Sequence, residues 1–212
     1  MGRRVPYLAP LSLFLWSNVF FFLIQSVSGL GILTWPLSVH LSDDSIRWAT
    51  SWLYAYARPG AGAPSEAYAN VFNALETVHA KSLVIVMLPA FALALAALTF
   101  DQRRPVRSAF TFSAHFFTFT LLWLSVLFLL LGLVVRAMAA GGITLPLHHS
   151  LDLAVSAIEA TVLAAYLYVA LGIVFDLSQL RRAVTVVVLI TALFVILKAY
   201  HVVVFAVTLL AT

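Results

Sequence analysis

The sequence contains no cysteine and little charge. Charged side chains make up 9% of its 212 residues, whereas 63% are hydrophobic. The missing cysteine excludes disulfide frameworks, zinc ribbons, thiolate nucleophiles and iron–sulfur ligation. Soluble domains carry roughly 25% charged residues, so this chain lacks the polar side chains that cover a surface in water. The composition predicts an integral membrane protein.

The signature motifs of common soluble enzymes are also missing. There is no Gly-x-Ser-x-Gly elbow, no His-Glu-x-x-His, no Gly-x-x-x-x-Gly-Lys loop and no Gly-x-Gly-x-x-Gly. The net charge is +4, but the arginines lie beside apolar runs rather than in one basic patch. Nucleic acid is therefore not an expected partner.

Five apolar runs are long enough to cross a bilayer, which requires ~20 residues. None alternates lipid-facing and lumen-facing residues, so a transmembrane barrel is not expected. The sequence predicts an all-α polytopic membrane bundle forming a single membrane domain over residues 1–212. The predicted spans are about 11–35, 82–100, 109–135, 153–175 and 183–210.

Most basic residues gather in three places: before the first span, in the second-to-third loop and in the fourth-to-fifth loop. The positive-inside rule assigns these places to the cytoplasm. The N-terminus is then cytoplasmic and the C-terminus lies outside. The residues concerned are Arg3, Arg4, Arg103, Arg104, Arg107, Arg181 and Arg182.

Residues 36–81 form an outer-face segment in this topology. Ser42-Asp43-Asp44 is typical of a helix start, and apolar residues follow at helical spacing beside two tryptophans. These features predict an interfacial amphipathic helix with the tryptophans at headgroup level. The residues that carry this pattern are Ile46, Trp48, Ala49, Trp52, Leu53 and Tyr56.

A second helix is predicted to begin at Ser65 and to run without interruption into the second span. Pro89 lies inside that span. Because proline removes a helical hydrogen bond, we expect a kink there.

The last two spans carry polar residues at matching depth. In an antiparallel hairpin, residues equally far from the loop lie at about the same height, and Glu159 then comes level with Tyr200. The sequence thus predicts an intramembrane cluster of Glu159, Lys198 and His201. A Glu159–Lys198 ion pair would hold the hairpin in register. A proton relay or a metal site is the functional alternative.

Glu76 and His79 are spaced i, i+3, so they lie on one helical face. Di-metal carboxylate bundles use this spacing, but they need it twice, and it occurs once here. Oxygen and nitrogen ligands without sulfur would favour Zn, Fe or Mn. The candidate ligands are Glu76, His79, Glu159 and His201, with His148 and His149 as further imidazoles.

Two polar residues lie on the inner side of the predicted bundle. His115 is about two turns from the cytoplasmic end of the third span, and Asn18 has a similar depth in the first. A hydrogen-bonded structural histidine is the simpler interpretation. A b-type haem would need a second axial ligand at matching depth, and the sequence offers none, so no haem is expected.

Three stretches together resemble a bacterial family of multi-pass inner-membrane proteins that is catalogued as a domain of unknown function. Residues 4–10 give a basic–Tyr–Pro entry to a phenylalanine-rich span, residues 88–93 read LPAFAL, and residues 112–119 read FSAHFFTF. The resemblance covers about residues 4–120. It implies a membrane fold and a bacterial inner-membrane location, and it supplies no activity.

The chain departs from this family in two respects. Many members have further histidines around the third stretch, and here only His115 matches. Members also often begin with a cysteine-containing zinc ribbon, so this chain would be either a short form without it or one whose start has been trimmed.

The leading hypothesis is an accessory, non-catalytic inner-membrane protein with an internal polar lock. The rival is a metal-dependent membrane enzyme with an outer-face His/Glu site. A proton-coupled carrier is a third alternative, although such carriers use paired broken helices and this sequence has one mid-span proline, Pro89. The expected partners are the lipid bilayer and either another membrane protein or further copies of the chain.

Overall fold

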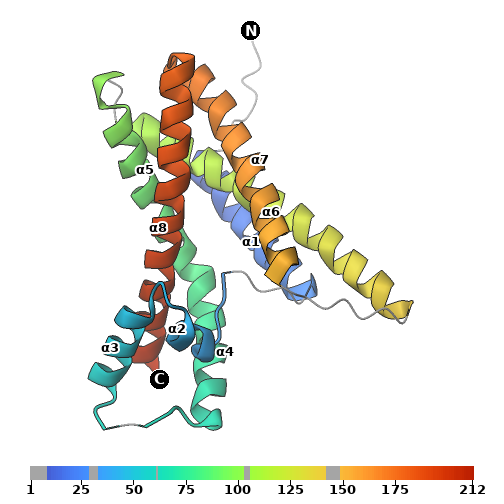
Figure 1. The fold of residues 1–212 in the computed structure, drawn as a ribbon. Helices are drawn as coiled ribbons and strands as arrows, with labels where there is room; N and C mark the ends of the chain where they lie inside the picture. Colours follow the sequence, from blue (N-terminus) through green and yellow to red (C-terminus); the bar gives the residue numbers. More distant parts are fainter. Residues whose placement is uncertain (1–8, 29–32, 61, 103–105, 142–148) are drawn as a thin grey trace. The chain divides into compact units, whose positions relative to one another are not determined.

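The computed structural model describes residues 9–28, 33–60, 62–102, 106–141 and 149–212, without the side chains of residues 28, 102 and 149–154. Every regular element in these ranges is a helix (Figure 1), which confirms the all-α class. The α-helices are α1 (Pro10–Ser28), α2 (Leu37–Ser42), α3 (Arg47–Ala57), α4 (Glu66–Leu83), α5 (Met87–Leu98), α6 (Val106–Ala140), α7 (His149–Phe175) and α8 (Gln179–Ala211). Two 3-10 turns, η1 (Val84–Val86) and η2 (Phe100–Gln102), complete the order.

Five helical segments are long and apolar enough to cross a membrane, as the sequence predicted. Large apolar side chains on these helices point away from the protein; Leu93, Ile173 and Val187 are 65%, 79% and 65% exposed. Such surface suits lipid rather than water. The five segments are Pro10–Val27, Glu66–Leu98, Val106–Ala140, Val155–Phe175 and Gln179–Ala211.

The first span ends earlier than its apolar run. The run continues to Trp35, but α1 ends at Ser28. Beyond it, the backbone N–H of Trp35 donates to Glu76 Oε1 at 2.9 Å, and that of Leu37 donates to Asn73 Oδ1 at 2.8 Å. These donors bond to side chains of α4 instead of to helical carbonyls, so hydropathy alone overextends the span.

The helix predicted to start at Ser65 and to run into the second span corresponds to α4, the turn η1 and α5. Ser65 caps its start, since the Tyr68 N–H donates to Ser65 Oγ at 3.3 Å. The helix tightens to the 3-10 turn η1 just before Pro89. Proline clashes with the carbonyl four residues earlier, here that of Ile85, so a local change of helix type accommodates it.

Helix α3 confirms the predicted amphipathic helix, with one difference. Ile46, just before it, and Ala49 within it are buried, whereas Trp48, Trp52 and Tyr56 are exposed. Tyr56 therefore belongs to the tryptophan face and not to the packed face. The rings of Trp52 and Tyr56 stack with centroids 5.6 Å apart.

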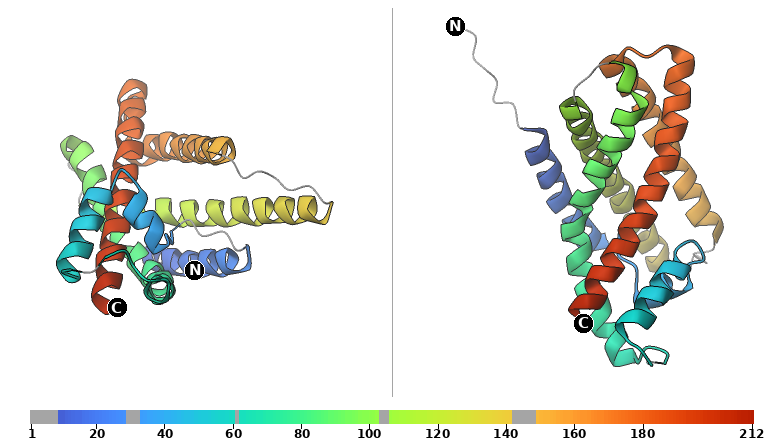
Figure 2. Two further views of the ribbon diagram at one scale, coloured as in Figure 1. Left: turned by 60° about the horizontal axis from the view of Figure 1, so that its bottom comes forward. Right: turned by 90° about the vertical axis from the view of Figure 1, so that its left-hand side faces the viewer.

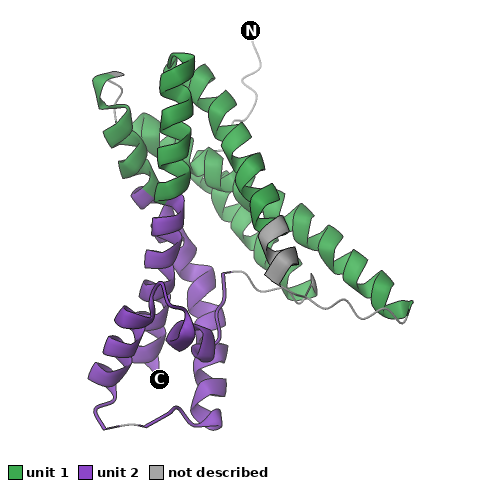
Figure 3. Ribbon diagram, in the orientation of Figure 1, with its two compact units in different colours: residues 1–30, 91–192 green, residues 31–90, 193–212 purple. Residues whose placement is uncertain are grey.

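The chain divides into two compact units (Figure 3): residues 1–30 with 91–192, and residues 31–90 with 193–212. In unit 1, α1 packs on α6, and Phe91 and Phe116 stack at 4.6 Å in the core. At one end of this unit, Arg181 forms an ion pair with Asp101.

Unit 2 contains α2, α3, α4 and the C-terminal part of α8. Figures 1 and 2 both show α2 and α3 beside this part of α8. Its apolar core consists of Leu37, Phe72, Phe205 and Leu209. Residues from three separate stretches of sequence thus meet in one core.

Candidate functional site

The polar residues singled out by the sequence divide between the units. Glu76 and His79 lie on α4 and Lys198 and His201 on α8, all within unit 2. Unit 1 contains Asn18 on α1, His115 on α6 and Glu159 on α7. His148 lies outside the described residues, as does the side chain of His149. The predicted cluster of Glu159 with Lys198 and His201 stays a prediction.

The centre of the unit 2 site is a buried carboxylate beside a buried imidazole. Glu76 is 1% exposed and His40 is 0% exposed. Glu76 Oε1 accepts the Trp35 N–H and lies 3.8 Å from His40 Nε2. Neither ring nitrogen of His40 has a hydrogen-bond partner. A carboxylate and an imidazole thus lie close together, and both are buried.

Trp35 joins this centre to α8. Its ring stacks on the imidazole of His201 with centroids 3.9 Å apart and an interplanar angle of 12°. Lys198 Nζ lies 4.6 Å from the centroid of the Trp35 ring, within the range of a cation–π contact. One tryptophan therefore contacts two of the residues that the sequence placed in the intramembrane cluster.

Lys198 pairs with Asp43, a residue just before α3. Lys198 Nζ donates to Asp43 Oδ2 at 3.2 Å and lies 3.4 Å from Oδ1. Burial would raise the pKa of Asp43, but hydrogen bonds from Ser45 and Lys198 outweigh it, and the pKa lies below its ordinary value. The carboxylate is thus held in its charged form, ready to pair with the ammonium group.

Helices α4 and α8 are also joined by hydrogen bonds away from this centre. His79 Nδ1 lies 3.0 Å from Thr208 Oγ1. The Tyr200 hydroxyl donates to the Ala80 carbonyl at 2.8 Å. Side chains that could serve chemistry are used here to hold one helix against another.

The structure brings together part of the candidate metal set. Glu76 and His201 both border Trp35, whereas His79 bonds to Thr208 instead. Within the part of the chain that the structure describes, no three His, Asp or Glu side chains form a group that could hold a metal ion. The ring of His40 lies 6.0 Å from that of His201, so the two imidazoles and Glu76 are neighbours without forming a ligand set.

The sequence analysis did not find Trp35, His40 and Asp43 as site residues. Nothing in the local pattern relates these residues to Lys198 or Glu76, because these partners lie 36 to 163 residues away. A useful signal was the cost of leaving a lysine unpaired within a span. That cost required a carboxylate partner, which the structure identifies as Asp43.

Comparison with models of protein families, with curated proteins and with solved structures finds no match. The five apolar helices define the class of the chain, a polytopic α-helical membrane protein. The resemblance over residues 4–120 stays a prediction.

Proposed function

We propose that this chain is a non-catalytic accessory protein of the bacterial inner membrane, with its N-terminus in the cytoplasm and its C-terminus outside. In this proposal unit 2 is a polar lock, defined by Trp35, His40, Asp43, Glu76, Lys198 and His201. The lock would fix residues 33–57, which contain α2 and α3 and are here called the outer segment, onto α4 and α8. That segment would then be presented to another membrane protein or to a further copy of the chain.

The observation that carries the proposal is how the polar groups of the lock are used. Glu76 accepts a backbone N–H of the outer segment, and Lys198 pairs with Asp43 of the same segment. In membranes helices associate through close packing and through hydrogen bonds between polar side chains, because lipid removes most of the hydrophobic driving force. These residues therefore add directional polar contacts to the apolar core of Leu37, Phe72, Phe205 and Leu209.

The burial of the central residues favours a structural lock over an active site. His40, Glu76 and His201 are at most 1% exposed, whereas ligand sites are concave surfaces that a substrate can enter. The ring of His40 is packed among those of Trp35, Phe72 and Phe205. A substrate would reach them only if the outer segment separated from α8.

A metal-dependent enzyme remains the second candidate because of one feature. Two buried imidazoles with nitrogens that lack hydrogen-bond partners lie beside a buried carboxylate. Histidine nitrogen with carboxylate oxygen suits Zn, Fe or Mn. A small rearrangement of His40, Glu76 and His201 would be required for all three to reach one ion.

Elemental analysis distinguishes the two candidates. Protein purified in mild detergent without a histidine tag would be compared with His40→Ala and Glu76→Gln, and with His79→Ala as a matched control outside the centre. We expect no stoichiometric metal in any sample, together with lower stability for His40→Ala and Glu76→Gln. About one Zn, Fe or Mn per chain, lost in these two variants and kept in the control, would overturn the accessory proposal.

A further inference from the structure

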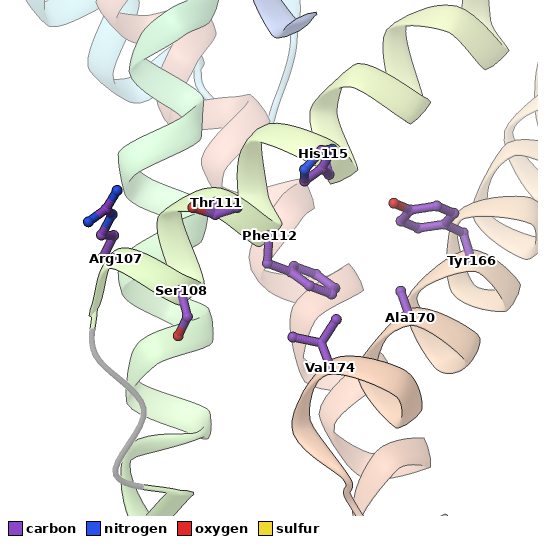
Figure 4. Close-up of a pocket in the computed structure, with 8 residues that line it drawn as sticks. All are labelled: Arg107, Ser108, Thr111, Phe112, His115, Tyr166, Ala170 and Val174. Carbon is purple, nitrogen blue, oxygen red and sulfur yellow. The ribbon is translucent and has the colours of Figure 1, made fainter. Parts of the chain in front are cut away.

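Unit 1 contains a cavity that the polar lock does not involve. It lies between α6 and α7 and has a volume of about 580 Å³. This falls within the 300–1,000 Å³ typical of pockets for small molecules. Figure 4 shows side chains of α6 along one side and of α7 along the other. The space is large enough for part of a lipid.

The polar residues of the cavity wall follow one another along α6. Arg107 and Ser108 lie at the start of the helix, Thr111 one turn further, and His115 one more turn along. His115 lies eight positions after Arg107, which corresponds to ~12 Å of helix. The hydroxyl of Tyr166 on α7 points toward His115 at this far end (Figure 4). The cation therefore marks one end and a histidine–tyrosine pair the other.

Between these ends the wall is apolar. Phe112 from α6 faces Ala170 and Val174 from α7. Ala170 follows Tyr166 by four residues and precedes Val174 by four, so the three lie on one face of α7. Because the side chain of Ala170 is small, it leaves open some space that a longer side chain would fill.

We propose that this cavity binds one acyl chain of an anionic phospholipid, with the phosphate beside Arg107. The guanidinium offers charge-assisted hydrogen bonds to phosphate oxygens. Ser108 and Thr111, within one turn of it, offer hydroxyls to the glycerol ester region. The acyl chain runs between Phe112 and the Ala170 face of α7, and His115 with Tyr166 closes the deep end.

A phospholipid fits better than a free fatty acid. The polar groups from Arg107 to Thr111 extend over a full helical turn, which matches a phosphate followed by ester groups rather than a single carboxylate. The arginine distribution assigns this end of α6 to the cytoplasm, and the cytoplasmic leaflet is the anionic one. The site would thus face lipids whose negative charge complements the positive charge of Arg107.

Native mass spectrometry in mild detergent tests the proposal with three probes: palmitoyl-oleoyl phosphatidylglycerol, phosphatidylcholine with the same chains, and palmitate. We expect phosphatidylglycerol to bind about tenfold more tightly than phosphatidylcholine, the size of one charge-assisted contact. Arg107→Gln should abolish this preference, and Arg107→Lys should keep most of it.

Filling the cavity gives a second readout. Ala170→Leu should lower phosphatidylglycerol binding at least tenfold, whereas Ala165→Leu, an exposed site on the same helix, should bind like the wild type. Equal binding of the two phospholipids, equal behaviour of the two leucine variants, or Ala170-dependent binding of palmitate without phosphatidylglycerol would each overturn the proposal. If Ala170→Leu does not fold, the headgroup preference of the Arg107 variants decides.

Discussion

The ion pair between Lys198 and Asp43 can be tested by a double-mutant cycle with Lys198→Met and Asp43→Asn. Both substitutions nearly preserve side-chain size and remove the charge. The two charged groups are 3.2 Å apart, and their side chains are 38% and 26% exposed. The pair is thus intermediate between a surface salt bridge and a buried one. Because it ties the outer segment to α8, its loss should weaken unit 2.

The geometry sets the expected magnitudes. A pair with this exposure should couple by about 1 kcal/mol. Lys198→Met also removes the contact with the Trp35 ring at 4.6 Å, which adds about 0.5–1 kcal/mol. We therefore expect a loss of about 1.5–2 kcal/mol for Lys198→Met and about 1 kcal/mol for Asp43→Asn. The double variant should lose about 1 kcal/mol less than the sum.

Reversible unfolding in mixed micelles, followed by circular dichroism, would give these free energies. Asp44→Asn is the matched control, because Asp44 pairs with Arg47 while both side chains remain largely exposed. It should cost no more than about 0.3 kcal/mol. Additive effects of the Asp43 and Lys198 variants, within about 0.3 kcal/mol, would refute the reasoning.

The same pair predicts how stability depends on pH. The pKa of Asp43 in the folded protein lies below its ordinary value of 3.8, so the folded state keeps the carboxylate charged to lower pH than the unfolded state does. Its stabilising contribution is fully present above pH 3.8 and is lost as the pH falls through the lowered pKa. Wild type should lose this part of its stability in unfolding measurements between neutral and acid pH, and Asp43→Asn should not.

Three further predictions concern packing and topology. A methyl group on Gly172 would meet the guanidinium of Arg182, the movable end of a flexible side chain, so the helix-propensity gain of Gly172→Ala, about 1 kcal/mol, should be largely offset in the wild type and fully present in an Arg182→Ala background; equal effects in both backgrounds would contradict the contact. Tyr200→Phe removes the bond to the backbone carbonyl of α4 and should cost about 1 kcal/mol in the same unfolding assay; an unchanged value would argue against that bond. Since the chain has no cysteine, a membrane-impermeant maleimide should label Trp52→Cys in intact cells and Leu180→Cys only after permeabilisation, and the reverse pattern would invert the proposed topology.

The five long helices were predictable because the evidence for them is local. A bilayer requires a run of apolar residues of fixed length, and a window along the sequence detects it. The helix ends were less predictable. Helix α6 extends from Val106 to Ala140, past both ends of the apolar run at 109–135. Helical hydrogen bonds continue through the polar end turns that contain Arg107 and Arg136, and a hydropathy window does not detect these turns.

The polar contacts were harder to predict because depth does not determine the partner. Counting from a loop gives the height of Lys198 in the membrane, but it leaves open which neighbouring segment faces the side chain. Asp43 was predicted to lie at a helix start, but it follows the last residue of α2, and its side chain accepts the Ser45 N–H at 3.0 Å in the turn before α3. Its pairing with Lys198 depends on how the chain folds back toward α8, and the spacing of residues in the sequence gives no information about that.

The polar residues along one side of α8 show how the polar contacts select the partners of this helix. Lys198, His201 and Thr208 follow one another at helical spacing, and they contact Asp43, Trp35 and His79 respectively. Lipid solvates apolar helix faces well, so polar positions such as these add specificity to the packing of Phe205 and Leu209 in the core of unit 2. They therefore help to determine which segment packs on this part of α8. Moving Lys198 by one residue, through Lys198→Ala with Ala199→Lys, would turn the cation by about 100° around the helix and should release the outer segment, detectable as faster proteolysis near residues 58–64, while Ala199→Lys alone should leave that segment protected.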